Sequence, residues 1–249
     1  MASRARIDQL LVERGLAASR DRARRLILAG KVLVNDCVVD KAGALVDVQA
    51  TIRLKVPDHP YVGRGGLKLE GALDDFRLDV AGLRCLDVGA STGGFTDCLL
   101  QRGAEHVVAT DVGSNQLAWK LRQDPRVTCH EQTDARSLTL ELVGDPVDLC
   151  VVDVSFISLR LILPSVRPLL AEGAPILALV KPQFEVGREH VGKGGRVQDD
   201  ALRQAAVDGV VAEAVQLGFE ETGRHDSRLE GAKSGNREVF LLVCPRRGC

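Results

Sequence analysis

The fold is decided by the stretch LRCLDVGASTGGFTD, residues 83–97. A short apolar run over Leu83–Val88 predicts a buried strand, and a helix is predicted over Thr96–Gln101, shortly after the glycines. The three glycines between them allow backbone conformations and close approaches that a side chain would prevent. A strand that leads through a glycine-rich turn into a helix is typical of a nucleotide cradle, because backbone N–H groups point at the ligand there.

The next predicted strand, His106–Asp111, ends in an acidic residue. Asp111 lies about 20 residues beyond Gly89, a spacing that suits a carboxylate binding two ribose hydroxyls. The glycines read G-x-x-x-G-G after Asp87, whereas dinucleotide folds show G-x-G-x-x-G. This pattern resembles the S-adenosylmethionine (SAM) loop of Rossmann-like methyltransferases. An ordinary strand–turn–helix corner is the alternative for this motif taken alone.

The composition is that of an ordinary globular protein. The chain has 249 residues, 45% hydrophobic and 27% charged, which fits one large domain and a small one. No run of 18 apolar residues occurs, so no membrane span is expected, and the N-terminal residues lack the apolar core of a signal peptide. The seven cysteines include no C-x-x-C pair. We therefore expect reduced thiols in a cytoplasmic protein, and neither a zinc site nor another metal site.

The net charge of -1 hides an asymmetry along the chain. Residues 1–70 contain 13 Lys and Arg against 8 Asp and Glu, whereas the remainder contains 20 against 26. A basic N-terminal module on a mildly acidic body suggests that the module binds a polyanion. An ordinary solvated charged surface is the alternative.

The N-terminal pattern predicts two helices followed by strands. Apolar residues recur at helical spacing over residues 7–11, with Gly15 placed to end the helix. Ser19 is the predicted N-cap of a second helix that extends through Leu28 and is closed by Gly30. The apolar period then changes to two, and the predicted short strands cover residues 31–35, 37–39 and 51–56.

This arrangement resembles the small RNA-binding module called the S-four domain. The matching strings are RIDQLLVERGL (6–16), SR (19–20) and GKVLVN (30–35). In that family, basic residues on the second helix and the following strand face RNA. The resemblance therefore implies RNA-binding roles for Arg6, Arg20, Arg24, Arg25 and Lys31.

The rest of the chain predicts an α/β domain. After a helix over residues 67–76, strands are predicted over 83–88, 106–111, 127–130, 147–152, 175–180, 219–226 and 238–244. Helical stretches separate most of them, which indicates parallel pairing, and the last two form a predicted antiparallel hairpin. The predicted fold class is α/β, a Rossmann-like, mostly parallel seven-stranded sheet beside a small N-terminal α+β domain. The predicted boundaries are 1–56, a linker 57–66, and 67–249.

Polar residues follow the ends of five predicted strands, where ligands collect in a doubly wound sheet. They are Asp87 with Gly89, Asp111, Thr133 with Asp134, Asp153, and Lys181. A lone aspartate at a strand end usually caps a turn, and a lysine that extends its charge into solvent is the alternative for Lys181. Five polar ends together indicate a site. Four charged residues lie on four separate predicted elements: Lys68, Asp153, Lys181 and Glu238. Two ammonium groups near two carboxylates can shift one another's pKa values.

At this point the chain resembles the FtsJ-like ribose 2'-O-methyltransferases, whose signature is a Lys-Asp-Lys-Glu tetrad. Joined to an S-four module, it resembles the TlyA family, also known as hemolysin A. The matching strings are GGLKL (65–69), DVGASTGGFTD (87–97), VDVSFIS (152–158), VKPQFE (180–185) and GNREV (235–239). The resemblance implies SAM-dependent methylation of a cytidine 2'-OH in ribosomal RNA, with ribosomal subunits as the expected context, and without a metal ion or a membrane.

The resemblance also implies residue roles. Lys181 orients and deprotonates the 2'-OH, and Asp153 positions Lys181 and lies near the methyl donor. Lys68 and Glu238 complete the network. The residues expected to bind SAM are Asp87, Gly89, Ser91, Thr92, Gly93, Gly94, Phe95, Asp111, Asp134 and Asp153, with Asp134 near the adenine. The sequence leaves open which lysine is the base.

The sequence has three alternative interpretations of function. Methyltransferases that act on amino groups typically show [DN]-P-P-[FYW] after the fourth strand, whereas this chain has DVSF at residues 153–156. An RNA-binding assembly factor with a relic SAM pocket would require a broken tetrad, and all four members are present. A membrane-lytic role rests on the older family label alone. The sequence leaves open which nucleotide of which subunit RNA is modified. It also leaves open whether the substrate is naked RNA or an assembled subunit, and which oligomeric state the protein has.

Overall fold

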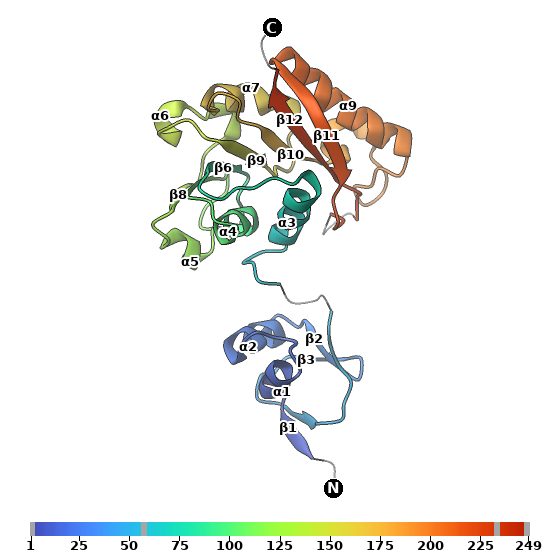
Figure 1. Ribbon diagram of the computed structural model, residues 1–249. Coiled ribbons are helices and arrows are strands. Elements are labelled where there is room, and N and C mark those ends of the chain that lie inside the picture. Colours follow the sequence, from blue (N-terminus) through green and yellow to red (C-terminus); the bar gives the residue numbers. More distant parts are fainter. Residues whose placement is uncertain (1–2, 56–58, 232–234, 247–249) are drawn as a thin grey trace. The chain divides into compact units, whose positions relative to one another are not determined.

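Figure 1 shows the computed structural model, which describes residues 3–55, 59–231 and 235–246. The chain forms two compact units that divide between Pro60 and Tyr61. This division falls inside the predicted linker of residues 57–66. Residues 57 and 58 of that linker lie outside the described residues.

Two helices, α1 (Ile7–Glu13) and α2 (Arg20–Leu28), provide most of the core of the N-terminal unit. The Ser19 side chain accepts a hydrogen bond from the backbone N–H of Arg22, as an N-cap does. After α1, Gly15 adopts a φ of +67°, a left-handed conformation that any larger residue would strain. The core cluster of this unit consists of Ile7, Leu10, Leu11, Ala17, Ala23, Leu26, Ile27, Val32 and Ile52.

The predicted strands form an antiparallel sheet in the order β3-β2-β5. These strands are β2 (Val32–Val34), β3 (Cys37–Val39) and β5 (Ile52–Leu54). Asn35 and Asp36 form the turn between β2 and β3, both at positive φ, as a tight two-residue hairpin requires. The sequence did not predict a second ribbon, in which β1 (Arg4–Arg6) pairs with β4 (Leu45–Asp47), because three-residue strands carry little periodicity.

The C-terminal unit is built on a seven-stranded sheet in the order β11-β12-β10-β9-β6-β7-β8, within the described residues. Its strands are β6 (Arg84–Val88), β7 (His106–Thr110), β8 (Val127–His130), β9 (Leu149–Val152), β10 (Ile176–Val180), β11 (Phe219–Asp226) and β12 (Val239–Pro245). The first five are parallel, and β12 runs antiparallel to both β10 and β11. The predicted fold class is therefore confirmed. The chain order reverses between β6 and β9, so their carboxyl ends form the topological switch point.

Helices cover both faces of this sheet (Figure 1). One face packs against α3 (Gly65–Phe76), α4 (Gly94–Gln101) and α5 (Trp119–Arg122). The other packs against α6 (Leu140–Val143), α7 (Leu163–Val166) and α9 (Asp200–Gln216). The strands are buried on both sides, which explains why β9 and β10 read as continuous apolar runs. A short helix, α8 (Pro182–Glu185), follows β10, and single 3-10 turns cover residues 135–137, 159–161, 167–169 and 188–190.

Residues 61–66, which the sequence predicts as part of a linker, are packed into the C-terminal unit. Tyr61 is 4% exposed, and its hydroxyl donates a hydrogen bond to Glu70 on α3. A Cβ on Gly66 would lie 2.3 Å from the Tyr61 ring, and one on Gly94 would lie 2.9 Å from the Gly66 nitrogen. The glycines of this segment therefore permit close packing between α3 and α4, and α3 begins at Gly65, two residues earlier than predicted.

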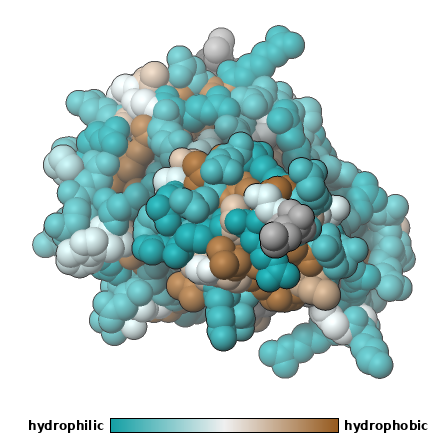
Figure 2. Space-filling view, turned by 90° about the horizontal axis from the view of Figure 1, so that it is seen from below, coloured by the Kyte–Doolittle hydropathy of each residue, from teal (hydrophilic) through white to brown (hydrophobic). Residues whose placement is uncertain are grey.

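Within the part of the chain that the structure describes, no helix is long and apolar enough to cross a membrane. On the face shown in Figure 2, hydrophilic residues predominate and hydrophobic residues occur in small groups. Among the described residues, the three most exposed of the large apolar side chains are Phe156, Val112 and Trp119, which all belong to the C-terminal unit.

Candidate active site

The glycine loop follows β6 and leads into α4. Gly89 and Gly93 have φ values of +89° and +93°, which favour glycine. A Cβ on Gly89 would lie 2.5 Å from the backbone oxygen of Asp153, and one on Gly93 would lie 2.3 Å from Leu121. The loop is therefore pressed against the end of β9 on one side and α5 on the other, and glycine is required at both positions.

Asp87 lies beneath this loop at the end of β6. Its side chain is fully buried, and Oδ2 accepts a hydrogen bond from the Thr96 hydroxyl at 2.6 Å. Its other oxygen, Oδ1, has no hydrogen-bond partner among the described residues. Burial raises the pKa of Asp87 to about 7, against the opposing effect of the Thr96 hydrogen bond. Asp87 therefore carries an unsatisfied polar atom directly behind the predicted cofactor loop.

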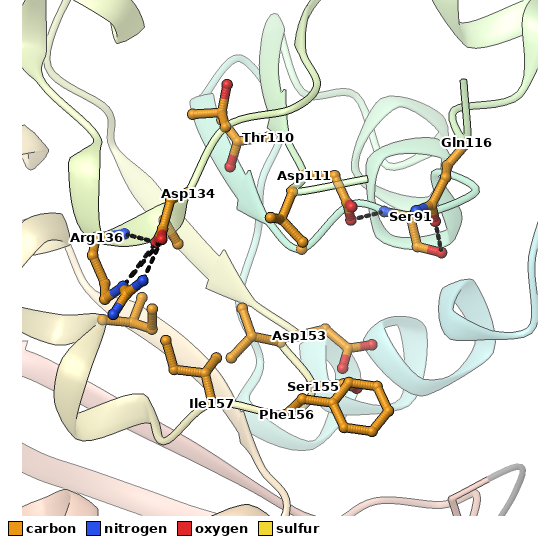
Figure 3. Close-up of a pocket in the computed structure, with 16 residues that line it drawn as sticks. Ser91, Thr110, Asp111, Gln116, Asp134, Arg136, Asp153, Ser155, Phe156 and Ile157 are labelled. Atoms are coloured by element: carbon orange, nitrogen blue, oxygen red, sulfur yellow. Dashed lines mark hydrogen bonds and ion pairs between the residues drawn. The ribbon is translucent and has the colours of Figure 1, made fainter. Parts of the chain in front are cut away.

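Asp111 connects the loop to the second strand end. Its Oδ2 accepts a hydrogen bond from the Ser91 N–H at 2.8 Å, and its Oδ1 accepts one from the Gly113 N–H at 2.7 Å. The Ser91 hydroxyl in turn lies 3.2 Å from the Gln116 side-chain oxygen. Figure 3 shows these side chains on one side of an open space.

Asp134 lies on the opposite side of that space, beside Arg136 (Figure 3). It caps the turn at 135–137 by accepting the Arg136 backbone N–H, and it also binds the guanidinium of the same residue. The Arg136 guanidinium lowers the pKa of Asp134 to about 2, so the carboxylate is ionised at neutral pH. Asp111 and Asp134 thus bring carboxylates to two sides of one opening.

The space between them is a cavity of about 610 Å³. Of the residues predicted to bind SAM, it is lined by Gly89, Ser91, Asp111, Asp134 and Asp153. An adjoining cavity of about 140 Å³ brings in Thr92, Gly94 and Phe95, together with Gly65 from α3. Asp87 and Gly93 line neither cavity and support the loop from behind.

Several lining residues were not predicted from the sequence. They are Thr110, Val112, Gln116, Ala135, Arg136, Val154, Ser155, Phe156, Ile157 and Ile162. Ser155 and Phe156 could have been found, because they directly follow the strand-end Asp153. Gln116 carries no such signal, since it lies in a loop five residues beyond Asp111.

Lys181 and Asp153 form an ion pair at the ends of β10 and β9. The Lys181 Nζ lies 2.6 Å from Asp153 Oδ1 and donates a hydrogen bond to the Ser155 hydroxyl at 2.8 Å. Asp153 Oδ1 makes no aligned hydrogen bond within the described residues, so its attraction to Lys181 is Coulombic. Because only 11% of the Lys181 side chain and 21% of that of Asp153 are exposed, the pair is partly withdrawn from water.

Lys68 and Glu238 form a second, more deeply buried ion pair. Lys68 lies on α3, and its Nζ donates a hydrogen bond to Glu238 just before β12. In the antiparallel register Val180 pairs with Val239, so Lys181 and Glu238 occupy the next pair of positions along these strands. The structure therefore brings all four predicted catalytic residues to the carboxyl-end edge of the sheet, as two ion pairs.

Phe156 is an exposed aromatic residue on the rim of the cavity. It is 84% exposed and has a φ of +68°, which is unusual for an aromatic residue and indicates a constrained backbone. Its ring centroid lies 5.2 Å from that of Phe184 on α8. In Figure 3 the Phe156 ring lies near Asp153 and Ser155.

The predicted RNA-binding residues lie in the N-terminal unit, and three of them share one partner. The side chains of Arg6, Arg20 and Arg24 each contact Asp8, a buried residue that the sequence analysis missed. Arg25 instead pairs with Asp21 at 3.4 Å, and Lys31 is exposed. Within residues 3–55, 59–231 and 235–246, no group of three or more His, Cys, Asp or Glu side chains could hold a metal ion.

Two family models match the chain. The FtsJ-like methyltransferase model matches residues 61–245, and the S4 domain model matches residues 5–52. These matches follow the two compact units of the structure.

Relatives of known name match nearly the whole chain. The chain is 52% identical to the 16S/23S rRNA (cytidine-2'-O)-methyltransferase TlyA of Mycobacterium tuberculosis, over 98% of this chain and 91% of the relative. It is 42% identical to Hemolysin A of Brachyspira hyodysenteriae, over 94% of this chain and 98% of the relative. A solved S-adenosylmethionine dependent methyltransferase from Mesorhizobium loti matches with a TM-score of 0.53 and 16% identity, over 73% of this chain and 100% of that one. The last likeness shows the fold alone.

Proposed function

The chain belongs to the TlyA family of FtsJ-like methyltransferases, and from this premise we propose that it methylates a cytidine 2'-OH in ribosomal RNA, with SAM as methyl donor. The observation that carries the proposal is the ion pair of Lys181 and Asp153 at the edge of the cavity beside the glycine loop. It brings an amine, a carboxylate and a cofactor-sized space to the switch point of the sheet.

The cavity fits SAM in size and chemistry. Its volume of about 610 Å³ lies within the usual range for small-molecule sites, which is about 300–1,000 Å³. Asp111 is placed to bind ribose hydroxyls, and the close-packed glycine loop presents backbone in place of side chains. Asp134 lies across the cavity, where it is suited to the adenine. When bound, SAM supplies an electrophilic methyl group.

The four charged residues then have distinct tasks. Lys181 hydrogen-bonds the 2'-OH, aligns its lone pair with the methyl group and is the proposed acceptor of the hydroxyl proton. Asp153 holds the Lys181 Nζ in place through the 2.6 Å contact. Lys68 and Glu238 join α3 to the start of β12, which lies beside the end of β10. Their direct pairing and burial support a positioning task for both.

Phe156 provides a surface for the substrate nucleobase. An exposed aromatic ring can stack on an unpaired base, a contact worth about 1–3 kcal/mol. Its constrained backbone and its place on the rim of the cavity, next to Asp153, support this assignment. A base stacked there would place its own ribose near Lys181.

The N-terminal unit delivers the RNA. Its S4 match and the half-exposed guanidinium groups of Arg6, Arg20 and Arg24 support contacts with RNA phosphates. The substrate is ribosomal RNA within ribosomal subunits, which places the enzyme in the cytoplasm. Residues 1–56, 57–66 and 67–249 remain our proposed functional division, although residues 61–66 pack with the catalytic unit.

The direct test is methyl transfer from tritiated SAM to separated ribosomal subunits from cells that lack this enzyme. The RNA is then digested to nucleosides. Tritium in 2'-O-methylcytidine supports the proposal and identifies the subunit. Tritium in a base-methylated nucleoside, or in ribosomal protein alone, contradicts it.

A further inference from the structure

Asp8 is a fully buried carboxylate at the start of α1, and arginine side chains surround it. Arg6 Nε donates to Oδ1 at 2.9 Å and its Nη2 donates to Oδ2 at 3.1 Å, which is a two-pronged contact. Arg20 Nη2 donates to Oδ2 at 3.1 Å, and Arg24 Nε lies 3.8 Å from the same oxygen. One aspartate thus joins side chains from β1 and from two successive turns of α2.

The arginines keep most of their donors for another partner. Their side chains are 39%, 53% and 55% exposed, whereas that of Asp8 is 0% exposed. Each guanidinium carries five N–H donors, and the contacts to Asp8 use one or two of them. The cluster therefore presents a surplus of two positive charges around a carboxylate that RNA cannot reach. The hydrogen bonds from Arg6, then from Arg20, lower the pKa of Asp8 to about 2, so it is ionised at neutral pH.

Other arginines of this unit have different tasks. Arg14 donates to the backbone oxygens of Val48 and Ala50 and so ties α1 to the loop before β5. Arg53 pairs with Asp36, and Arg25 pairs with Asp21, both at exposed carboxylates. The shared buried partner is thus a feature of the Arg6, Arg20 and Arg24 cluster.

Resting on the proposed RNA function, we infer that Asp8 is a positioning residue that prearranges Arg6, Arg20 and Arg24 as a clamp for RNA phosphates. Long arginine side chains lose conformational freedom when they bind, and each ordered side chain weakens affinity. Side chains that Asp8 already holds in the free protein avoid much of that loss. A guanidinium group in a fixed position can form two parallel hydrogen bonds to a phosphate, whereas the ammonium group of a flexible lysine acts as a point charge.

Asp8→Asn separates this idea from simple charge. The change keeps the side-chain shape and adds one positive charge to an RNA-binding surface, so charge alone predicts tighter binding. Positioning predicts the opposite, namely a KM for ribosomal subunits that rises about 10-fold. Asp21→Asn is the matched control, because it adds the same charge on α2 but frees only Arg25.

The full-length variants are compared in methyl transfer to ribosomal subunits from cells lacking the enzyme. We expect Asp8→Asn to raise KM while kcat, SAM affinity and the amide protection of residues 7–28 stay at wild-type values. We expect Asp21→Asn to leave KM unchanged or lower. In an Arg6→Ala, Arg20→Ala, Arg24→Ala background, adding Asp8→Asn should raise KM no further, because its effect acts through those arginines.

A KM for Asp8→Asn at or below the wild-type value would overturn the inference in favour of charge alone. Loss of amide protection over residues 7–28 would overturn it in favour of a purely structural role, and so would a further rise of KM in the triple-arginine background. Failure of the proposed function has a different signature. In that case the wild-type enzyme itself does not methylate the subunits, or the triple-arginine variant binds them as the wild type does.

Discussion

Asp8 in the N-terminal unit and Asp87 in the C-terminal unit are both fully buried. Their surroundings nevertheless shift the pKa values of the two carboxyl groups in opposite directions. Hydrogen bonds from Arg6 and Arg20 lower the pKa of Asp8 to about 2. Asp87 has the Thr96 hydroxyl instead of a cation, and burial raises its pKa to about 7. Charged partners, more than burial, therefore decide whether a buried carboxylate is ionised in this protein.

The same contrast extends to the tasks of the two units. In the N-terminal unit, positive groups around Asp8 stay half-exposed, where they can meet phosphates. In the C-terminal unit, the pairs Lys181–Asp153 and Lys68–Glu238 are withdrawn from water, where their mutual positions are fixed. Exposed charge suits capture of a polyanion, and enclosed charge suits the alignment of reacting groups.

The largest effect on stability should follow from breaking the most buried pair. Glu238→Gln leaves the Lys68 ammonium buried without its counter-charge, which should lower the unfolding free energy of the C-terminal unit by about 3–5 kcal/mol. Glu189→Gln is the control, because Glu189 is exposed beside His190 and should change stability by less than about 1 kcal/mol. Hydrogen exchange of the β10 and β12 amides measures both. Equal values for the two variants would show that burial does not distinguish these pairs.

The contrast between Asp8 and Asp87 can be tested by pH. Asp87 ionises near pH 4 when unfolded and near pH 7 when folded, so the folded state binds more protons between these values. The unfolding free energy of the C-terminal unit should therefore fall by up to about 4 kcal/mol as pH rises from 4 through 7.

Asp87→Asn should remove that slope. Asp8 contributes to the unfolding free energy of the N-terminal unit, and this contribution is lost as pH falls from about 4 through 2. It therefore adds no slope between pH 5 and 8. Opening free energies from hydrogen exchange at several pH values report each unit separately. The assignment fails if the slope is the same in wild type and Asp87→Asn.

A smaller effect is expected at the cofactor loop. Asp111→Ala removes the acceptor of the Ser91 and Gly113 N–H groups together with the proposed ribose contacts. SAM affinity should fall by about 10-fold or more, from a loss of about 1.5–3 kcal/mol. Asp124→Ala is the control, since Asp124 binds Arg126 and lines neither cavity. Unchanged SAM affinity of folded Asp111→Ala in calorimetry would remove Asp111 from the site.

Most of the fold could be predicted because its signals are local. The β9 and β10 runs are apolar at every position, as strands buried on both faces must be, and Ser19 and Gly15 mark helix ends. Asp153 and Lys181 could be predicted to meet because each follows a parallel strand, and the carboxyl ends of parallel strands lie at one edge of the sheet.

What could not be predicted depends on contacts between distant segments. Residues 57–66 were predicted to be a linker, but the glycines at 63, 65 and 66 permit close packing beside α4, a reason that local sequence does not carry. Asp8 gave no signal, because its role depends on arginines 12 and 16 residues further along the chain as well as on Arg6. The short strands β1 and β4 were missed because only their pairing defines them.

We propose that the N-terminal unit captures RNA and the C-terminal unit performs the chemistry. Steady-state methyl transfer to ribosomal subunits, compared between Lys181→Ala and Arg20→Ala/Arg24→Ala, separates these two tasks. We predict that Lys181→Ala lowers kcat by about 10²–10⁴-fold without changing KM, while the arginine variant raises KM without changing kcat. Lys120→Ala, which breaks an ion pair that lines neither cavity, should match the wild type. A Lys181→Ala enzyme that keeps a tenth of the wild-type kcat, or an arginine variant that loses kcat at an unchanged KM, would contradict the account.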